Sequence, residues 1–468
     1  MDLNGDGLRD VVIGPNNTSL GNEVVPVAPV FLLNHGGGRF LDATQQLFVG
    51  SPPLIEWDRE LLTADFNRDG RPDLFIADHG HVNDSDPSAS RNGAQQHLIL
   101  STADGHLVDA SANLPQQLTF THSAAVADVN GDGAPDIFEN NLGCCSAGHV
   151  QAQLLLNDGS GRFSVAPDRL HGILTDQYGN DHSFACAFAD VNGDGSPDLI
   201  LGGSEAQDAS QILINDGHGN FTSAEILPPS IGPAHNVFVI DIRPVDVNGD
   251  GAVDLVFAES LNDPYYQTSR IQVLINDGHG RFSDETPTWM PQQPQTSSWP
   301  ERLLVEDVDD DGRPDLTIHF GGFGPTTQIA PTALYLNTGN TFKQAVAPRD
   351  GFDNLGAIGY INGAGPHALF SVEFQSLGSG LSNYYVDAQI LAPLAPTGVR
   401  AVRIAAGVRV SWKPVAAASR YQVRRRGKLI AVTAATSFVD RAPGKRPTYT
   451  VRSSNAAGTS ADSPSVTP

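Results

Sequence analysis

One nine-residue pattern recurs six times along the chain and constrains its fold more than any other feature. The copies are DLNGDGLRD (2–10), DFNRDGRPD (65–73), DVNGDGAPD (128–136), DVNGDGSPD (190–198), DVNGDGAVD (246–254) and DVDDDGRPD (307–315). Their first aspartates lie 56 to 63 residues apart. An internal period of this length indicates an array or a closed ring of supersecondary units.

The segments around each copy read as short strands. In the third repeat, SAAVADV (123–129) precedes the acidic stretch and DIFEN (136–140) follows it, and then QAQLLLN (151–157) and RFSVA (162–166) flank the turn NDGSG. Asn-Asp-Gly between apolar runs predicts a hairpin, because Asn and Gly tolerate the positive φ of tight turns. Each repeat therefore predicts four antiparallel strands. Four-stranded units repeated around an axis are the blades of a β-propeller.

A seventh, eroded unit follows the six copies. YINGAGPHALFSVEF (360–374) keeps the asparagine and glycines of the pattern without its aspartates, and YYVDAQIL (384–391) supplies one more strand. We therefore predict an all-β fold with a seven-bladed β-propeller over residues 1–392. Because Met1 immediately precedes the first copy, the innermost strand of the first blade is missing. We expect an N-terminal truncation, which also explains the lack of a signal peptide.

The pattern changes from residue 393 onward. Strand-like segments with turn signals at regular spacing fill residues 393–468, which predicts an immunoglobulin-like β-sandwich. The segments are VRVSWKP (408–414), SRYQVRRRG (419–427), SFVDRAP (437–443) and TYTVRSSNAAG (448–458).

Charge divides the chain in the same place. The net charge is −25, but residues 393–468 hold 13 Lys and Arg against 2 Asp and Glu, so residues 1–392 carry −36. A body this acidic repels nucleic acid and anionic membrane, so we expect neither as a partner. We also expect no transmembrane segment, because no apolar run approaches the ~18 residues that a membrane span needs. The basic tail either adheres to an acidic polymer or is simply a solvated face.

The three cysteines form no disulfide framework and no zinc pattern. A strained bridge between the neighbours Cys144 and Cys145 is possible, and it would imply an oxidising compartment. Cys186 lies in an apolar stretch and reads as a small core residue.

The acidic stretches have the ligand chemistry of calcium loops. Oxygen ligands at alternate positions of a tight turn can converge on one hard cation. In the third copy, Asp128, Asn130, Asp132 and Asp136 would supply side-chain oxygens and Ala134 its carbonyl oxygen. The spacing resembles the first half of an EF-hand loop but lacks its distal Glu and its helices.

The alternative is that Asp, Asn and Gly merely make good turns. Turn formation needs one or two such residues, whereas six copies repeat three carboxylates at fixed spacing, and without cations the 20 loop aspartates would repel one another. We therefore predict up to six Ca²⁺ sites. Their ligands are Asp2, Asn4, Asp6, Asp10, Asp65, Asn67, Asp69, Asp73, Asp128, Asn130, Asp132, Asp136, Asp190, Asn192, Asp194, Asp198, Asp246, Asn248, Asp250, Asp254, Asp307, Asp309, Asp311 and Asp315.

These motifs resemble the FG-GAP (VCBS) repeats of integrin α-type propellers, and the tail resembles a fibronectin type III domain with Trp412 as its core tryptophan. The resemblance implies an extracellular or cell-surface location and calcium in the blade loops. Propellers of this kind occur in adhesion proteins, lectins and some polysaccharide lyases.

The face opposite the acidic loops is the expected ligand face. Long insertions and the starts of the innermost strands meet there, and variable loops on a rigid frame often carry function. The candidate ligand-binding residues are Trp57, Arg59, His122, His182, His235, Trp299 and Arg302. Large residues at strand starts are also common as plain packing.

The sequence favours a binding protein over an enzyme. It contains no GxSxG, HExxH, phosphate-binding or dinucleotide-binding motif. We expect a secreted calcium-binding propeller that adheres to a glycan or a protein. The alternative is a calcium-dependent polysaccharide lyase with His122, His182 or Tyr265 as its base.

Overall fold

The computed structural model describes most of the chain. The described residues are 1–15, 26–36, 39–80, 93–142, 150–173, 183–204, 209–230, 236–261, 266–308, 311–321, 330–345, 355–360, 367–376, 382–390, 393, 395–415, 418–455 and 459–468, with the backbone alone from 355 to 390. They form two compact units. The first comprises Met1–His35, Arg39–Val305 and Pro314–Asp353, and the second Gly36–Gly38, Glu306–Arg313 and Asn354–Pro468.

Six sheets make up the first unit. Sheet 1 holds β1 (Val11–Ile13), β2 (Val30–Asn34) and β3 (Phe40–Asp42), and sheet 2 holds β4 (Asp58–Ala64), β5 (Asp73–Asp78), β6 (His97–Ser101) and β7 (Leu107–Asp109). Sheet 3 holds β8 (Thr121–Ala127), β9 (Asp136–Asn141), β10 (Gln153–Asn157) and β11 (Phe163–Val165). Sheet 4 holds β13 (Ala185–Ala189), β14 (Asp198–Gly202), β15 (Gln211–Asn215) and β16 (Phe221–Ile226), with β12 (Leu170–His171) parallel to β16.

The remaining sheets of this unit repeat the same order. Sheet 5 holds β17 (Val237–Val245), β18 (Asp254–Leu261), β19 (Gln267–Asn276) and β20 (Phe282–Asp284). Sheet 6 holds β21 (Trp299–Glu306), β22 (Asp315–Gly321), β23 (Ala333–Asn337) and β24 (Phe342–Gln344). The described helices are single turns: α1 (Thr44–Leu47), α2 (Thr286–Trp289) and 3-10 turns at Ser111–Asn113 and Pro167–Arg169.

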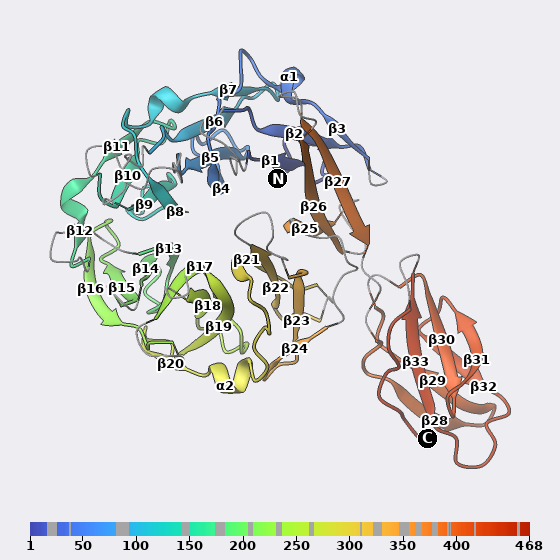
Figure 1. Cartoon of the computed structure of the whole chain (residues 1–468). Coiled ribbons are helices and arrows are strands. Elements are labelled where there is room, and N and C mark those ends of the chain that lie inside the picture. The colour runs from blue at the N-terminus through green and yellow to red at the C-terminus, as the bar shows by residue number, and fades with distance from the viewer. Residues whose placement is uncertain are drawn as a thin grey trace. The chain divides into compact units, whose positions relative to one another are not determined.

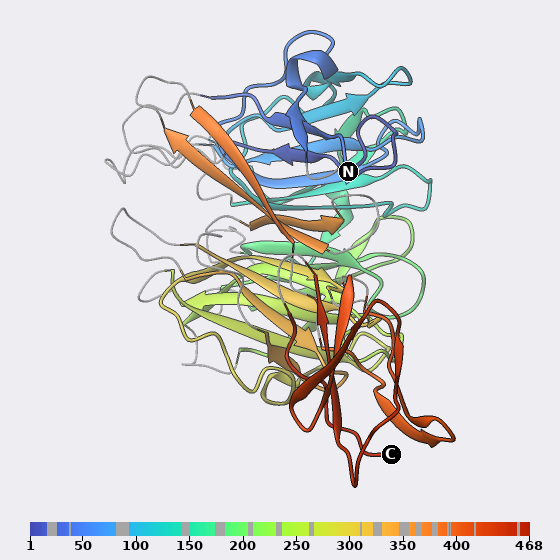
Figure 2. The ribbon, with the colours of Figure 1, turned by 90° about the vertical axis from the view of Figure 1, so that its right-hand side faces the viewer.

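The sheets of the first unit follow one another around an arc. Figure 1 shows the first strands β4, β8, β13, β17 and β21 toward its inside and the fourth strands β7, β11, β16, β20 and β24 toward its outside. In the view turned by 90°, most strands of this unit run across the page (Figure 2). In sheets 2 to 6 the acidic loop connects the first strand to the second, and in sheet 1 it precedes β1.

The hydrophobic core of this unit lies between neighbouring sheets. Phe75 of β5 and Leu98 of β6, for example, pack with Ile137 of β9 and Leu155 of β10. The predicted core residue Cys186 is one of the buried residues between sheets 3 and 4, so that interpretation is confirmed. A sheet covered on both faces buries successive residues, which explains why β5 and β9 are buried throughout and show no alternation of apolar and polar residues.

The second unit contains three more sheets. One is β25 (Leu355–Tyr360), β26 (His367–Ser376) and β27 (Ser382–Ile390). The others are β28 (Arg400–Ile404), β29 (Gly407–Ser411) and β32 (Ser437–Asp440), and β31 (Lys428–Thr433), β30 (Arg420–Arg425) and β33 (Tyr449–Ser454). The last two sheets share one core, in which Val408 and Val410 of β29 pack with Val423 of β30, Val451 of β33 and Trp412.

The predicted strand order is largely confirmed. The described part of sheet 1 has three strands and begins with the strand that follows the acidic loop, as the position of Met1 predicted. The eroded seventh unit also has three described strands, and the last of them, β27, overlaps the strand predicted at 384–391. No helix among the described residues is long and apolar enough to span a membrane.

Candidate functional site

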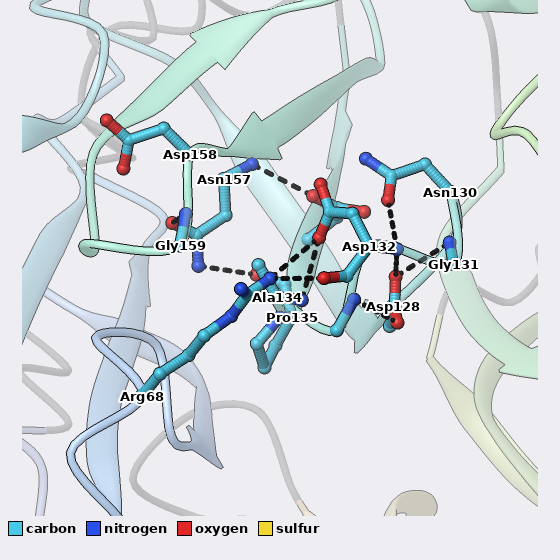
Figure 3. A network of polar contacts seen from close by, with 12 residues as sticks. Arg68, Asp128, Asn130, Gly131, Asp132, Ala134, Pro135, Asn157, Asp158 and Gly159 are labelled. Carbon is cyan, nitrogen blue, oxygen red and sulfur yellow. Dashed lines mark hydrogen bonds and ion pairs between the residues drawn. The ribbon is translucent and has the colours of Figure 1, made fainter.

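The third acidic loop shows how the repeated pattern folds. The carboxylate of Asp128 accepts hydrogen bonds from the backbone N–H groups of Gly131, Asp132 and Gly133 at 2.9, 3.1 and 2.8 Å. The side-chain oxygen of Asn130 accepts a hydrogen bond from the backbone N–H of Asp132 at 2.9 Å. The first aspartate therefore closes the turn, and the residues after it are fixed around its carboxylate (Figure 3).

The same frame recurs in the other loops. Asp2, Asp190 and Asp246 accept the same three backbone N–H groups of their own loops. The glycine at position six has a φ between 82° and 92° in all six loops, a left-handed conformation that disfavours any side chain. This requirement explains the invariant glycine in the sequence pattern.

The side chains at positions three and five contact each other in several loops. The Asn4, Asn67, Asn192 and Asn248 amides each donate a hydrogen bond to the aspartate two residues later, at 2.8 to 3.3 Å. Among the described residues, no group of three or more His, Cys, Asp or Glu side chains lies close enough together to hold a metal ion. The loop oxygens instead accept hydrogen bonds from backbone and amide donors.

The donor set nevertheless has the chemistry that a hard cation requires. The first five loops present carboxylate, amide and carbonyl oxygens without nitrogen or sulfur ligands, and this set suits Ca²⁺. A carboxylate oxygen that accepts one hydrogen bond keeps a second lone pair. The residues therefore fit calcium by type, and binding requires the side chains at positions three and five to turn toward a common point.

The closing aspartate has a structural role that the sequence reading missed. Asp136 is fully buried and accepts hydrogen bonds from the backbone N–H groups of Val129 at 3.1 Å and Asn157 at 2.9 Å. Burial, together with the nearby Asp132 and Asp128 carboxylates, raises the pKa of Asp136 to about 6 against the pull of these hydrogen bonds. The pKa values of Asp198 and Asp254 are raised to about 6 for the same reasons.

The asparagine of each NDG turn links neighbouring sheets. The Asn157 amide donates hydrogen bonds to the carbonyl oxygen of Pro135 in its own sheet at 3.0 Å and to that of Phe66 in sheet 2 at 2.9 Å. Its side-chain oxygen accepts hydrogen bonds from the turn glycines Gly159 and Gly161. Equivalent links join Asn215 to Val129, Asn276 to Val191 and Asn337 to Val247.

The predicted ligand face is a packed layer of aromatic rings. Trp57 lies against His79, and His79 against Phe120 and His122, with ring centroids 3.8 to 5.6 Å apart. The series continues from His122 through Phe184, Phe238 and Tyr266 to Trp299, with centroids 4.8 to 5.1 Å apart. The side chains of His122 and Trp299 are buried, so both act mainly in packing between sheets.

Arginines join the first strands to one another. Arg59 of β4 donates to the His122 carbonyl oxygen of β8 at 3.2 Å, and Arg302 of β21 donates to the Arg59 carbonyl oxygen at 2.9 Å. The Arg302 guanidinium also lies 3.8 Å from the Glu60 carboxylate. The structure therefore brings Arg59, His122 and Arg302 together, but through contacts within the protein.

Burial shifts the pKa values of the ionisable side chains around these arginines. It raises the pKa of Asp58 to about 7 and also raises the pKa of Glu60, although Arg302 opposes both shifts. Burial, then Arg59 and His79, hold the pKa of His122 well below its usual range. Its Nδ1 lies 2.8 Å from the Phe184 carbonyl oxygen, which can only accept. A neutral His122 with its proton on Nδ1 satisfies this contact.

Several predicted positions lie outside the described residues. They are His182, His235, Tyr265, Asp309, Cys144 and Cys145.

Comparison with known proteins identifies the repeats. A family model described as the FG-GAP-like repeat matches residues 2–76, 190–243 and 246–318. Integrin alpha pat-2 of Caenorhabditis briggsae is 27% identical over 230 residues, which are 45% of this chain and 18% of that protein. The chain thus spans about a fifth of the length of this relative.

Solved structures give weaker likenesses. A mutant FN3tt structure covers 17% of this chain and 96% of its own, with 18% identity and a TM-score of 0.15. An α-L-arabinofuranosidase (CtGH43) of Clostridium thermocellum covers 62% and 95% with 12% identity, and BBS1N in complex with ARL6DN covers 74% and 93% with 14% identity, both at a TM-score of 0.32. Such scores support no conclusion on fold or function. The conclusion from the family match and the integrin relative is that the chain is an all-β protein that carries FG-GAP-like repeats.

Proposed function

We propose that this chain is a secreted or cell-surface adhesion protein, a calcium-binding β-propeller whose face opposite the acidic loops binds a glycan or protein ligand. The observation that carries the proposal is the repeated loop frame, in which the first aspartate is held by the same backbone N–H groups in loop after loop. A frame that fixes a carboxylate at one end of an all-oxygen loop is suited to a hard divalent cation.

Electrostatics supports calcium in these loops. In the third loop, burial and, to a smaller extent, repulsion from the Asp132 and Asp128 carboxylates raise the pKa of Asp136 to about 6. A divalent cation would relieve this repulsion and act as a structural clamp. The ligands would be the side-chain oxygens of positions one, three, five and nine and the carbonyl oxygen of position seven. Extracellular modules with such loops bind calcium at ~10⁻⁴–10⁻³ M.

The sheet arrangement supports the propeller itself. Six sheets in one unit and β25–β27 in the other match seven blades, and the repeats are of the FG-GAP type. We assign the propeller to residues 1–392. The two sheets with a shared core in residues 393–468 support our assignment of a fibronectin type III-like sandwich, which would serve as a spacer or attachment module.

Adhesion is favoured over catalysis. The FG-GAP-like repeats and the match to an integrin alpha chain favour an adhesion propeller. The one described candidate base, His122, is buried and its Nδ1 contacts the Phe184 carbonyl oxygen, so it is poorly placed to take a proton from a substrate.

The test is a screen of the calcium-loaded full chain against immobilised glycans and extracellular-matrix proteins. The proposal predicts retention on one class of ligand and no formation of unsaturated uronates, measured by their ultraviolet absorbance. Turnover of a uronate polymer would establish the lyase instead. Ligand binding that is unchanged in EDTA would show that calcium is not required for it.

A further inference from the structure

Arg68 stands where the other described loops have glycine. It occupies position four of the second acidic loop, and Gly5, Gly131, Gly193 and Gly249 fill that position in loops one, three, four and five. These glycines have φ between 73° and 76°, and Arg68 adopts a φ of 58°. A side chain in this left-handed region is disfavoured, so the arginine needs a compensating contact.

That contact is with the third loop. One terminal nitrogen of Arg68 donates hydrogen bonds to the carbonyl oxygen of Asp132 at 2.6 Å and to its carboxylate at 3.0 Å. The guanidinium lies over two glycines of sheet 3, since a Cβ added to Gly133 or Gly159 would stand 3.6 or 3.1 Å from it. Figure 3 shows the arginine reaching from sheet 2 toward Asp132.

Asp132 is one of the expected cation ligands of its loop. The aspartates at the same position in loops one, two, four and five, Asp6, Asp69, Asp194 and Asp250, receive a neutral amide of their own loop instead. The third loop thus differs from these four in having a full positive charge from another sheet against the carboxylate that calcium would need.

We infer that Arg68 is a built-in counter-ion that competes with Ca²⁺ for Asp132, and that it makes the third loop a weaker site than loops one, two, four and five. This inference rests on the proposed function. The guanidinium carries a full positive charge that faces the Asp132 carboxylate at 3.0 Å. Calcium entering the loop must displace Arg68 or bind beside it, and both routes reduce its affinity.

Solvent exposure limits how much Arg68 can weaken calcium binding. The side chains of Arg68 and Asp132 are 44% and 47% exposed, so water and salt screen their interaction. Removing the arginine should strengthen calcium binding at one site by about 1.5- to fivefold, the range of one exposed charge pair near a protein surface. The gain should shrink as the salt concentration rises.

The experiment is calcium titration of the full chain by isothermal calorimetry, after stripping with EDTA, at low and high salt. The variants are Arg68→Gln and Arg68→Gly, the second of which restores the residue of the other loops. Arg162→Gln is the matched control, because it removes the same charge from an exposed position in the NDG turn of sheet 3. Each variant is also made in an Asp132→Asn background.

The inference predicts that both Arg68 variants tighten one site, that Arg162→Gln does not, and that the gain disappears when Asp132 is Asn. If the wild type binds calcium and the Arg68 variants bind it with the same or a lower affinity, this inference alone is overturned. A gain in affinity that persists when Asp132 is replaced by Asn would also overturn it, because the gain would then come from the change in net charge and not from the pairing with Asp132. A wild-type chain that binds no calcium at millimolar concentrations would overturn the proposed calcium sites as well.

Discussion

The Asn157 amide of sheet 3 donates a hydrogen bond to the carbonyl oxygen of Phe66 in sheet 2, at 2.9 Å. Both groups are buried, and the same amide also reaches the Pro135 carbonyl oxygen. One side chain thus connects an NDG turn, its own acidic loop and the loop of the preceding sheet. The repeat pattern therefore encodes the contacts between neighbouring sheets as well as the fold of each sheet.

Replacing Asn157 by alanine should destabilise the first unit markedly. The change leaves two buried carbonyl oxygens and the turn N–H groups without their partner, and we expect a loss of about 2–4 kcal/mol in the free energy of unfolding. The measurement is urea unfolding of the full chain. Asp158→Ala, one residue later and exposed, is the control and should cost within about 0.5 kcal/mol. Equal losses for the two variants would refute the sheet-to-sheet role.

Ionisation of the Glu139 carboxyl should lower the free energy of unfolding as the pH rises. Glu139 is 2% exposed, its carboxylate accepts a hydrogen bond from Gln153 at 2.7 Å, and burial raises its pKa from 4.5 to about 7. A raised folded-state pKa means that the contribution of this residue to stability is fully present below about pH 4.5 and is lost as the pH rises through 7. The total change is on the order of 3 kcal/mol.

The variant Glu139→Gln isolates this effect. A neutral amide keeps the acceptor for Gln153 without the buried charge, so the variant should match the wild type at pH 5 and exceed it at pH 8. The measurement is the free energy of unfolding of both proteins across this range. Parallel pH profiles would contradict the assignment.

Arg302 should stabilise the first strands by compensating buried carboxylates. Replacement by glutamine removes its bond to the Arg59 carbonyl oxygen and its attraction for Glu60. We expect a loss of about 1–3 kcal/mol, less than for a fully buried ion pair because 32% of the Arg302 side chain is exposed. Adding Glu60→Gln should restore part of the loss, and Arg39→Gln, an exposed arginine of sheet 1, should have little effect. Additive losses would argue against the pairing.

Tyr449 should stabilise the sandwich of residues 393–468. Its buried hydroxyl donates a hydrogen bond to Asp440 at 2.8 Å, and Arg425 pairs with the same carboxylate oxygen. Tyr449→Phe should lower the free energy of unfolding of this sandwich by about 1–3 kcal/mol. Thr450→Val, which removes an exposed hydrogen bond to Asp462, should change it little.

The sandwich transition should also be independent of calcium, since the predicted calcium ligands lie outside residues 393–468. Differential scanning calorimetry of the full chain with calcium or EDTA checks both statements. A Tyr449→Phe effect confined to the calcium-sensitive transition would contradict them.

The strand pattern could be read from the sequence because local signals agree with one another. Gly133, at position six of its loop, and the NDG turn at 157–159 fix the turns, and the apolar run 74–77 of β5 reflects burial on both faces. These features depend on residues close together in the chain. Their spacing was enough to place most of the strands.

The tertiary roles could not be read in the same way. Asn157 and Phe66 are 91 residues apart, and Arg302 and Arg59 are 243 apart, so spacing gives no hint of these contacts. We expect the candidate ligand residues Trp57 and Trp299 at an open mouth, and in the structure they lie in a series of tilted and edge-to-face ring contacts. One signal was available for Arg68, since an arginine at a position otherwise filled by glycine indicates a special contact.

The most direct test is the number of calcium ions bound per chain at millimolar free calcium, measured by equilibrium dialysis after stripping with EDTA. The account predicts several bound ions, up to six, with one fewer in Asp132→Ala and a higher melting temperature of the first unit in calcium than in EDTA. No bound calcium, with melting curves that coincide in calcium and EDTA, would contradict it.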